Sequence, residues 1–330
     1  MTILGKKQMS EEDIKLNFIT PAIQRGWKGH ITMETRITDG RINIRGNIVV
    51  RSKPKFADYL LYLNDGKPIA VVEAKDNNHS VSHGLQQAMT YAQMMDLPFA
   101  YSSNGDAFYE HDFLTGQEQQ IALEKFPTQD ELIARYYAEL NGGKGISALE
   151  KKIVSQPYYS SQSTYPPRYY QRNAVNRTVE AIARGQQRLL LVMATGTGKT
   201  YTACLAAYRM LSYTPMRRVL FLVDRNNLGK QVEGEFGTFR LTENGDAFNT
   251  IFTVNRLRSS SIPSDSNVVI STIQRLFSFL KGEAIEDNDD DDENEPAEEV
   301  TLPPNPNLPH DYFDMIIIDE CHRSIYGNWR

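Results

Sequence analysis

A glycine-rich turn near the middle of the chain contains residue types that can hold phosphate. Residues 193–200 read Met-Ala-Thr-Gly-Thr-Gly-Lys-Thr and follow the apolar run 189–192. Glycines let backbone N–H groups point into one cradle, and a helix that follows would add its positive N-terminus. We predict a nucleoside-triphosphate site, in which the lysine reaches the outer phosphates and the last threonine binds Mg²⁺, made by Thr195, Gly196, Thr197, Gly198, Lys199 and Thr200. The alternative is a turn that binds nothing.

Two adjacent carboxylates complete this predicted site. Asp319 and Glu320 directly follow the apolar residues 315–318, which are typical of a buried strand. In a parallel α/β sheet such residues emerge at the carboxyl end of the strand, where ligands bind. We expect Asp319 to hold Mg²⁺ and Glu320 to orient or deprotonate the attacking water. Taken alone, an Asp-Glu pair is more often the start of a solvated loop.

A second pair of carboxylates lies on a predicted hairpin near the N-terminus. Asp65-Gly66 is a strong two-residue turn signal, and a hairpin closed there places Asp58 directly opposite Glu73. Opposed carboxylates repel unless a cation lies between them, and Mg²⁺ suits such oxygen ligands. Lys75 projects from the same face, where it can neutralise charge on a phosphate. The pattern predicts a magnesium site that acts on phosphate, with a plain surface hairpin as the alternative.

The neighbouring residues favour a nucleic-acid substrate. Five cations and no carboxylates occur in residues 41–55, among them Arg45, Arg51, Lys53 and Lys55. Such a stripe neutralises phosphates, although a solvated strand face has the same composition. Gln87 and Tyr91 share a face of the helix expected at about 82–95. There they would contact DNA, support the metal site or form a simple interfacial pair.

The elements that would position these residues indicate two α/β domains. Helices are expected at 10–24 and 82–95, and strands at about 43–51, 56–63, 68–75, 188–193, 218–223, 250–254, 267–271 and 314–319. The last five strands alternate with helical segments, which is typical of a parallel sheet. A stretch rich in Gly, Ser and Pro separates the two sets. We therefore predict one domain at 1–145, a linker at 146–164 and a second domain at 165–330.

Composition excludes several classes of protein. With 40% hydrophobic and 23% charged residues, the chain is typical globular material. Two distant cysteines, no secretory leader and no apolar run of membrane-spanning length predict a cytoplasmic protein. Ten carboxylates fall within 286–299 without a Lys or Arg, so the net charge of −5 conceals a mildly basic remainder. We expect an acidic, disordered insertion at about 282–310.

The order of these motifs resembles known families. A strand–turn–strand followed by a helix resembles the PD-(D/E)xK nucleases in Asp58, Glu73, Lys75, Gln87 and Tyr91. Ala57 stands at that family's proline position. The phosphate loop and the run Asp-Glu-Cys-His at 319–322 look like a superfamily 2 helicase or translocase, and Gln171 resembles the adenine-reading glutamine ahead of that core. Such a nuclease fused to such a motor is similar to the R (HsdR) subunit of type I restriction–modification enzymes.

This resemblance implies a fold and an activity. The fold would be α/β: a PD-(D/E)xK-like mixed sheet with flanking helices, then a RecA-like parallel-sheet lobe truncated after the strand before Asp319. The activity would be Mg²⁺-dependent DNA cleavage coupled to ATP-driven translocation on double-stranded DNA, in a complex with methylation (M) and specificity (S) subunits. Glu11 or Glu12 would correspond to an acid on the first nuclease helix. The resemblance also implies contacts with the DNA backbone by Asp224, Arg225, Thr272, Gln274 and Arg275.

One departure from the family and two other interpretations remain. The family's motor has a second lobe with an arginine finger, and the chain ends ten residues after Glu320, so we expect weak ATP binding and no translocation.

One alternative is a repair or defence helicase whose N-terminal domain binds DNA without cutting it. The other is a non-enzymatic product that occupies partner surfaces. Asp58→Ala or Lys75→Ala discriminates, because only a nuclease would lose cleavage while keeping its ATPase.

Overall fold

The computed structural model of the chain contains two compact units. It describes residues 5–38, 42–45, 48–51, 53–64, 67–140, 147–148, 152, 167–241, 244–259, 261–283, 305 and 308–321. The first unit comprises Met1–Tyr158 and Pro167–Asn173, and the second comprises Tyr159–Pro166 and Ala174–Arg330. The division falls close to the linker expected at 146–164. Each unit is described by itself below.

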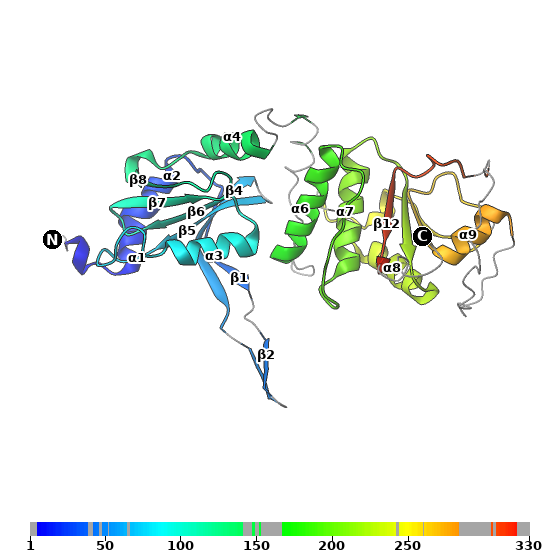
Figure 1. Ribbon diagram of the computed structural model, residues 1–330, viewed down its shortest axis with the longest axis horizontal. Coiled ribbons are helices and arrows are strands. Elements are labelled where there is room, and N and C mark those ends of the chain that lie inside the picture. The colour runs from blue at the N-terminus through cyan, green and yellow to red at the C-terminus, as the bar shows by residue number, and fades with distance from the viewer. Residues whose placement is uncertain are drawn as a thin grey trace. The chain divides into compact units, whose positions relative to one another are not determined.

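A six-stranded mixed sheet forms the centre of the first unit (Figure 1). Its order is β1 (Ile31–Thr38), β4 (Lys55–Asn64), β5 (Lys67–Ala74), β6 (Phe99–Ser103), β7 (Ala107–Asp112) and β8 (Glu118–Ala122). Within this sheet β5 and β6 pair in parallel, and the other neighbours pair antiparallel. Every residue of β5 is buried, because strands flank it on both sides and apolar side chains cover both of its faces.

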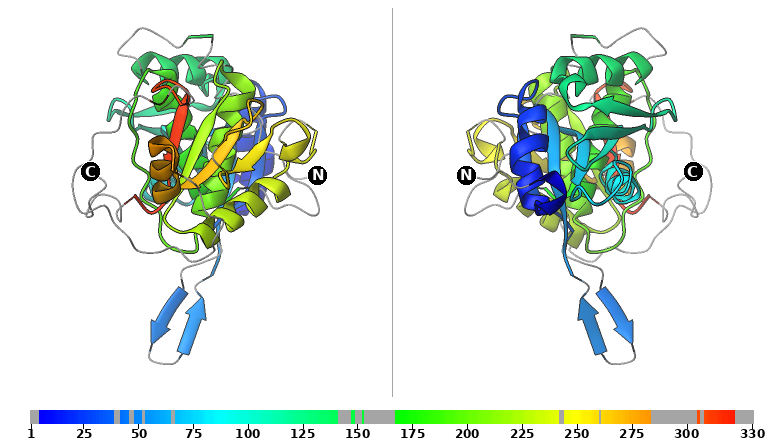
Figure 2. Two further views of the ribbon diagram at one scale, coloured as in Figure 1. Left: turned by 90° about the vertical axis from the view of Figure 1, so that its right-hand side faces the viewer. Right: turned by 90° about the vertical axis from the view of Figure 1, so that its left-hand side faces the viewer.

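Helices cover both faces of this sheet (Figure 1 and Figure 2, right). The helical run expected at 10–24 is present as α1 (Glu11–Ile14), a π-helical segment (Lys15–Ile19) and α2 (Thr20–Gln24). Together with α4 (Gln129–Leu140), this run packs on the face that includes Tyr59. Helix α3 (Leu85–Met95) packs on the face that includes Leu60. Successive residues of a strand point to opposite faces, so the two helical layers enclose the sheet.

A separate two-stranded ribbon replaces the strand predicted at 43–51. β2 (Ile42–Arg45) and β3 (Ile48–Arg51) pair antiparallel with each other and lie outside the six-stranded sheet (Figure 1). The prediction of one continuous strand is therefore wrong. Apolar alternation runs through both halves of this segment, but the two halves pair with each other across residues 46–47.

A four-stranded parallel sheet forms the centre of the second unit (Figure 2, left). Its order is β10 (Val254–Arg256), β11 (Val268–Thr272), β9 (Val219–Val223) and β12 (Met315–Ile318). Its helices are α7 (Lys199–Tyr213), α8 (Asn226–Thr238) and α9 (Ile273–Lys281), while α6 (Tyr169–Ala183) crosses the division between the units. The predicted α/β class, a mixed sheet followed by a parallel sheet, is confirmed.

The strand predicted at 188–193 is absent. Residues 186–194 form neither helix nor strand, and Leu190 and Val192 are 71% and 89% exposed. An apolar run becomes a strand only where a neighbouring strand pairs with it, and β12, at the edge of the described sheet, pairs with β9 alone. The strand predicted at 250–254 is also displaced, because β10 begins at Val254.

Some predictions fall on parts of the chain outside the described residues. These parts include the turn residues Asp65 and Gly66 and the acidic run at 286–299. Among the helices that the structure does describe, none is long and apolar enough to cross a bilayer. Cys204 and Cys321 are free thiols.

Candidate functional site

The register of β4 and β5 places Asp58 across from Glu73, as the turn signal predicts. Tyr59 pairs with Val72, so the next position along the two antiparallel strands joins Asp58 to Glu73. Both side chains lie in the interior, with exposed fractions of 9% for Asp58 and 1% for Glu73. Two carboxylates therefore face each other inside the protein, where water screens their repulsion little.

The two carboxylates differ in their hydrogen bonds. The backbone N–H of Ala74 donates to Asp58 Oδ2 at 2.7 Å. Glu73 Oε1, by contrast, is buried without a hydrogen-bond partner. Burial, together with the negative charge of Asp58, raises the pKa of Glu73 to about 8. A bound cation would satisfy this oxygen and remove the repulsion.

Lys75 faces the same side of the sheet as Glu73. A Cβ atom added to Gly84, at the start of α3, would lie 3.3 Å from Glu73 Cβ and 3.5 Å from Lys75 Cγ. Both side chains therefore pass beside Gly84, and a larger residue there would crowd them. Lys75 Nζ also lies 3.9 Å from Glu11 Oε2. Glu11, one of the two acids expected on the first helix, is thus part of this cluster, and burial raises its pKa.

The chemistry of these ligands fits magnesium. Mg²⁺ in proteins commonly binds one or two carboxylates and retains several waters. Asp58 and Glu73 offer two, and the unpartnered Glu73 oxygen supplies a free ligand atom. Among the described residues, no group of three or more His, Cys, Asp or Glu is arranged to hold a metal. The protein would therefore contribute these two side chains, and water would complete the coordination.

Lys15 is a site residue that the sequence did not predict. It is 2% exposed, and its ammonium lies 2.6 Å from Asp58 Oδ1 and 2.8 Å from Glu34 Oε1. Burial opposes its charge, but hydrogen bonds to these carboxylates outweigh burial and raise the pKa of Lys15. Its spacing of four residues from the buried Ile19 is the signal that could have shown that it faces inward. Glu34 lies on β1, a strand that was not predicted.

Gln87 and Tyr91 lie together on α3, as predicted from their spacing. The Gln87 amide donates to the Tyr91 hydroxyl at 3.1 Å. Lys55 Nζ lies 5.6 Å from the centre of the Tyr91 ring, and burial raises the pKa of that tyrosine. The pair thus links α3 to a cation of the predicted basic stripe.

The rest of that basic stripe divides between two elements. Arg45 lies at the end of β2 and Arg51 at the end of β3, so both belong to the separate ribbon. Their side chains are outside the described residues. Lys53 and Lys55 precede or begin β4 and are exposed. The stripe therefore runs from the ribbon to the strand that carries Asp58.

The phosphate loop in the second unit has the predicted backbone form. Gly196 and Gly198 have φ of 76° and 80°, a region that favours glycine. Helix α7 begins at Lys199, directly after Gly198. The Thr197 hydroxyl donates to the Ala194 carbonyl at 2.6 Å and stabilises the turn. The N–H groups at this helix start, including that of Thr200, provide an anion-binding surface.

The carboxylates after β12 meet this loop. The Lys199 ammonium donates to Glu320 Oε1, and this bond raises the pKa of Lys199. The backbone N–H of Glu320 donates to Asp319 Oδ1 at 2.9 Å, and Glu320 has a φ of 50°. Burial raises the pKa of Asp319. The structure therefore brings Lys199 together with Asp319 and Glu320, which lie more than a hundred residues further along the sequence.

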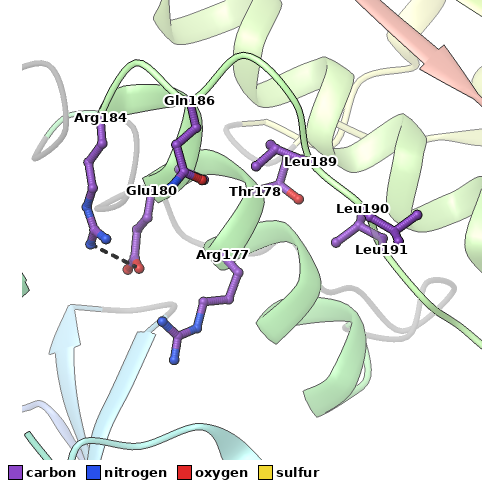
Figure 3. Close-up of a pocket in the computed structure, with 9 residues that line it drawn as sticks. Arg177, Thr178, Glu180, Arg184, Gln186, Leu189, Leu190 and Leu191 are labelled. Atoms are coloured by element: carbon purple, nitrogen blue, oxygen red, sulfur yellow. Dashed lines mark ion pairs between the residues drawn. The ribbon is translucent and has the colours of Figure 1, made fainter.

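A pocket of about 280 Å³ lies beside α6 in the second unit (Figure 3). Its walls are Arg177, Thr178, Glu180 and Ala181 of α6, then Arg184, Gln186 and residues 189–191, which follow the helix. Arg184 and Glu180 form an ion pair at 3.8 Å. No residue of the phosphate loop lines this pocket. The apolar residues predicted as a strand thus line a surface pocket instead.

Gln171 belongs to the first unit. It lies near the start of α6, is buried, and its side-chain oxygen accepts a hydrogen bond from the Arg168 backbone N–H at 2.9 Å. The phosphate loop belongs to the second unit. An adenine-reading role for Gln171 therefore stays a prediction.

The residues expected to contact DNA in the second unit fall into two groups. Asp224 and Arg225 lie between β9 and α8, with an ion pair at 3.6 Å, and Gln274 is half-buried on α9. Thr272 and Arg275 are buried, at 2% and 9% exposed. The Thr272 hydroxyl caps α9, and the Arg275 guanidinium donates to the Leu257 carbonyl at 3.3 Å. Both side chains therefore have partners within the protein, and their contact with DNA stays a prediction.

Comparison with known proteins shows the family. The profile "Type I restriction enzyme R protein N terminus" matches residues 28–127, and the profile "Type III restriction enzyme, res subunit" matches residues 164–330. The EcoAI endonuclease subunit of a type I restriction enzyme from Escherichia coli is 34% identical over 98% of this chain. The chain belongs to the R (HsdR) subunit family of type I restriction enzymes.

Other R subunits agree with this assignment. The EcoKI endonuclease subunit of Escherichia coli K12 is 30% identical over 82% of the chain. A solved fragment structure assigned to an HsdR subunit of a type I restriction enzyme from Vibrio vulnificus YJ016 superposes with a TM-score of 0.71, at 31% identity over 98% of this chain and 53% of that one. The chain spans 37% of the length of the EcoAI subunit and 24% of the EcoKI subunit.

Proposed function

We propose that this chain supplies the Mg²⁺-dependent endonuclease centre and an ATP-binding lobe of a double-stranded DNA translocase within a type I restriction enzyme. The observation that supports it most is the pair Asp58–Glu73, with Lys75 beside it and one buried carboxylate oxygen unpartnered. The relatives' names as endonuclease subunits agree with it.

The nuclease centre would act on a phosphodiester. Asp58 and Glu73 would hold Mg²⁺, which when bound would polarise the phosphate and activate water. Lys75, on the same face, would neutralise negative charge that develops on the phosphate oxygens. Glu11 lies 3.9 Å from Lys75 and would orient its ammonium. Gln87 and Tyr91, joined by a hydrogen bond within α3, would support this centre from the helix.

The nucleotide centre would act on ATP. Backbone N–H groups from Gly196 to Thr200 would cradle the phosphates, and Thr200 and Asp319 would hold the accompanying Mg²⁺. Lys199, now bound to Glu320, would turn to the outer phosphates. Glu320 would then orient the attacking water.

The DNA substrate would contact cations near both centres. Phosphates beside the nuclease centre would be held by Arg45, Arg51, Lys53 and Lys55. In the second unit, Arg225 and Gln274 would contact the DNA beside the parallel sheet. We also propose M and S partner subunits, because the chain belongs to the type I R-subunit family. The recognised DNA sequence would then depend on those partners.

The test uses a complete type I complex whose R subunit carries this sequence. Asp58→Ala and Lys75→Ala should abolish DNA cleavage, by at least about a hundredfold in rate, while DNA-stimulated ATP hydrolysis continues. Asp130→Ala, which removes an exposed carboxylate from α4, is the matched control and should cleave normally. Cleavage that survives both substitutions would show that this domain binds DNA without cutting it.

A further inference from the structure

Four polar side chains occupy one row across the sheet of the first unit. Glu34 of β1 is the position opposite Asp58 of β4, because the pairs on either side, Met33 with Tyr59 and Thr35 with Ala57, are in register. Asp58 in turn lies opposite Glu73 of β5, and Glu73 pairs with Ser102 of β6. Three carboxyl groups in neighbouring strands leave two intervals, and ionised groups on both sides of an interval repel unless a cation lies between them.

The first interval already contains a cation. Lys15 Nζ lies 2.6 Å from Asp58 Oδ1, 2.8 Å from Glu34 Oε1 and 3.0 Å from Glu12 Oε1. Its side chain is 3% exposed, so the charge is enclosed rather than solvated. The second interval differs, because Glu73 Oε1 has no hydrogen-bond partner.

Two uncommon backbone features bring Lys15 and Glu34 together. The helix changes from α to π geometry at Lys15–Ile19, and π segments within helices are rare. Glu34 has a φ of 49°, which costs roughly 1–3 kcal/mol for a residue other than glycine. Both features position side chains of the same ion cluster. The rest of the fold must stabilise this contact enough to offset that strain.

We propose that Lys15 takes the place of a second divalent cation in the nuclease centre. Its ammonium neutralises the interval between Glu34 and Asp58 and leaves one metal position, between Asp58 and Glu73. This inference rests on the proposed nuclease function. The Asp58 carboxylate is also held in one orientation, because its Oδ1 pairs with the Lys15 ammonium and its Oδ2 accepts a hydrogen bond from the Ala74 backbone N–H. A carboxylate held in this way is a preorganised metal ligand.

The spacing of the oxygens around Lys15 suits an ammonium. Its three shortest contacts measure 2.6–3.0 Å, whereas Mg²⁺ requires oxygen ligands at about 2.0–2.1 Å. Glu12 and Glu34 have exposed side chains, at 74% and 58%. They can therefore move toward a smaller cation if the ammonium is removed.

The test counts Mn²⁺ ions bound to the 330-residue chain without nucleotide, by calorimetric titration and by electron paramagnetic resonance of free Mn²⁺. Ions that disappear in Asp58→Asn belong to this centre, which separates them from any ion at the phosphate loop. The wild-type chain should bind one such ion. Lys15→Met, which removes the charge and keeps the length, should bind two, and Lys15→Arg should still bind one.

The numbers of bound ions distinguish the role of Lys15 from the existence of the metal centre. Two Asp58-dependent ions in the wild-type chain, or one ion in a folded Lys15→Met variant, would overturn the role of Lys15. No Asp58-dependent ion in the wild-type chain would instead contradict the proposed metal centre itself. The double variant Lys15→Met with Glu34→Gln should return to one ion, because it loses a ligand of the second position. If Lys15→Met does not fold by circular dichroism, the wild-type count decides: one supports the proposal and two overturn it.

Discussion

The buried position of Glu73 changes its proton equilibrium. Burial and the negative charge of Asp58 raise its pKa from 4.5 to about 8. Without a metal, the folded chain at neutral pH therefore keeps Glu73 protonated, whereas the unfolded chain ionises it. Between these two pKa values, the folded state binds a proton that the unfolded state has released.

The metal-free chain should lose stability as pH rises from about 5 to about 8. The contribution of Glu73 is complete below its unfolded pKa and is lost as pH passes its folded pKa, with a total on the order of a few kcal/mol. Urea unfolding in EDTA at several pH values measures this loss, with Glu73→Gln as the comparison. Parallel pH profiles for the two proteins would contradict the raised pKa.

The residues of the candidate site differ in how far sequence predicts them. Asp58, Glu73 and Lys75 were predictable because a turn signal and the two-residue period of strands determine which side chains face each other. Lys15 was not predicted, because a lysine four residues after Glu11 is typical of a solvated helix pair. Its role depends on Glu34, which lies in β1, a strand that was not predicted although apolar and polar residues alternate along part of it.

Among the elements, the start of α3 lies close to Glu73 and Lys75, the residues proposed for the nuclease centre. Gly84 precedes α3, and a Cβ there would lie 3.3 Å from both Glu73 Cβ and Ser102 Cβ. Such contacts are tighter than ordinary packing, so any side chain at this position forces α3 or β5 to shift. The absence of a side chain at Gly84 lets the helix pass directly over Glu73 and Lys75.

Gly84→Ala adds only one methyl group, but it should lower both the stability of the first unit and its affinity for Mn²⁺. We expect a stability loss of about 1–2 kcal/mol from overpacking and several-fold weaker Mn²⁺ binding, because the ligands are displaced. Scanning calorimetry and Mn²⁺ titration provide the two measurements. Gly234→Ala, on α8 with open space around it, is the control and should be neutral or gain up to about 1 kcal/mol. Wild-type stability and affinity in Gly84→Ala would exclude this role.

The prediction of helices and strands succeeded where local sequence signals were sufficient. It failed where the formation of a strand depends on pairing with a distant strand. The β4–β5 hairpin, α3 and the strands β9, β11 and β12 followed from turn residues and apolar runs. Residues 188–193 have the same apolar character but no strand partner in the described structure, so they remain outside the sheet. Strands β6 to β8 depend on long-range pairing that their sequence pattern does not show.

For the whole molecule, the two proposed chemistries belong to separate units. The clusters around Tyr59 and Leu60 lie in the first unit, and a further cluster around Leu220 lies in the second. Asp58 and Glu73 depend on the former, and Lys199 and Glu320 on the latter. The order of motifs predicted a mixed sheet followed by a parallel sheet, because each set of motifs requires its own sheet.

The two centres should respond to substitution independently. Lys199→Ala should weaken binding of a non-hydrolysable ATP analogue by about 10- to 100-fold, because it removes a charge-assisted bond, and should leave the Asp58-dependent Mn²⁺ count unchanged. Asp58→Asn should remove that Mn²⁺ and keep analogue affinity within about twofold. Calorimetric titrations of both variants check this. A variant that impairs both ligands would show that the units share a site.

The bond between Lys199 and Glu320 has a consequence for the sequence of events in the proposed motor. The side chain expected to bind phosphate donates a hydrogen bond to the carboxylate expected to orient water. A phosphate that recruits Lys199 would release Glu320 in the same event. Water would thus be activated only after the nucleotide has arrived.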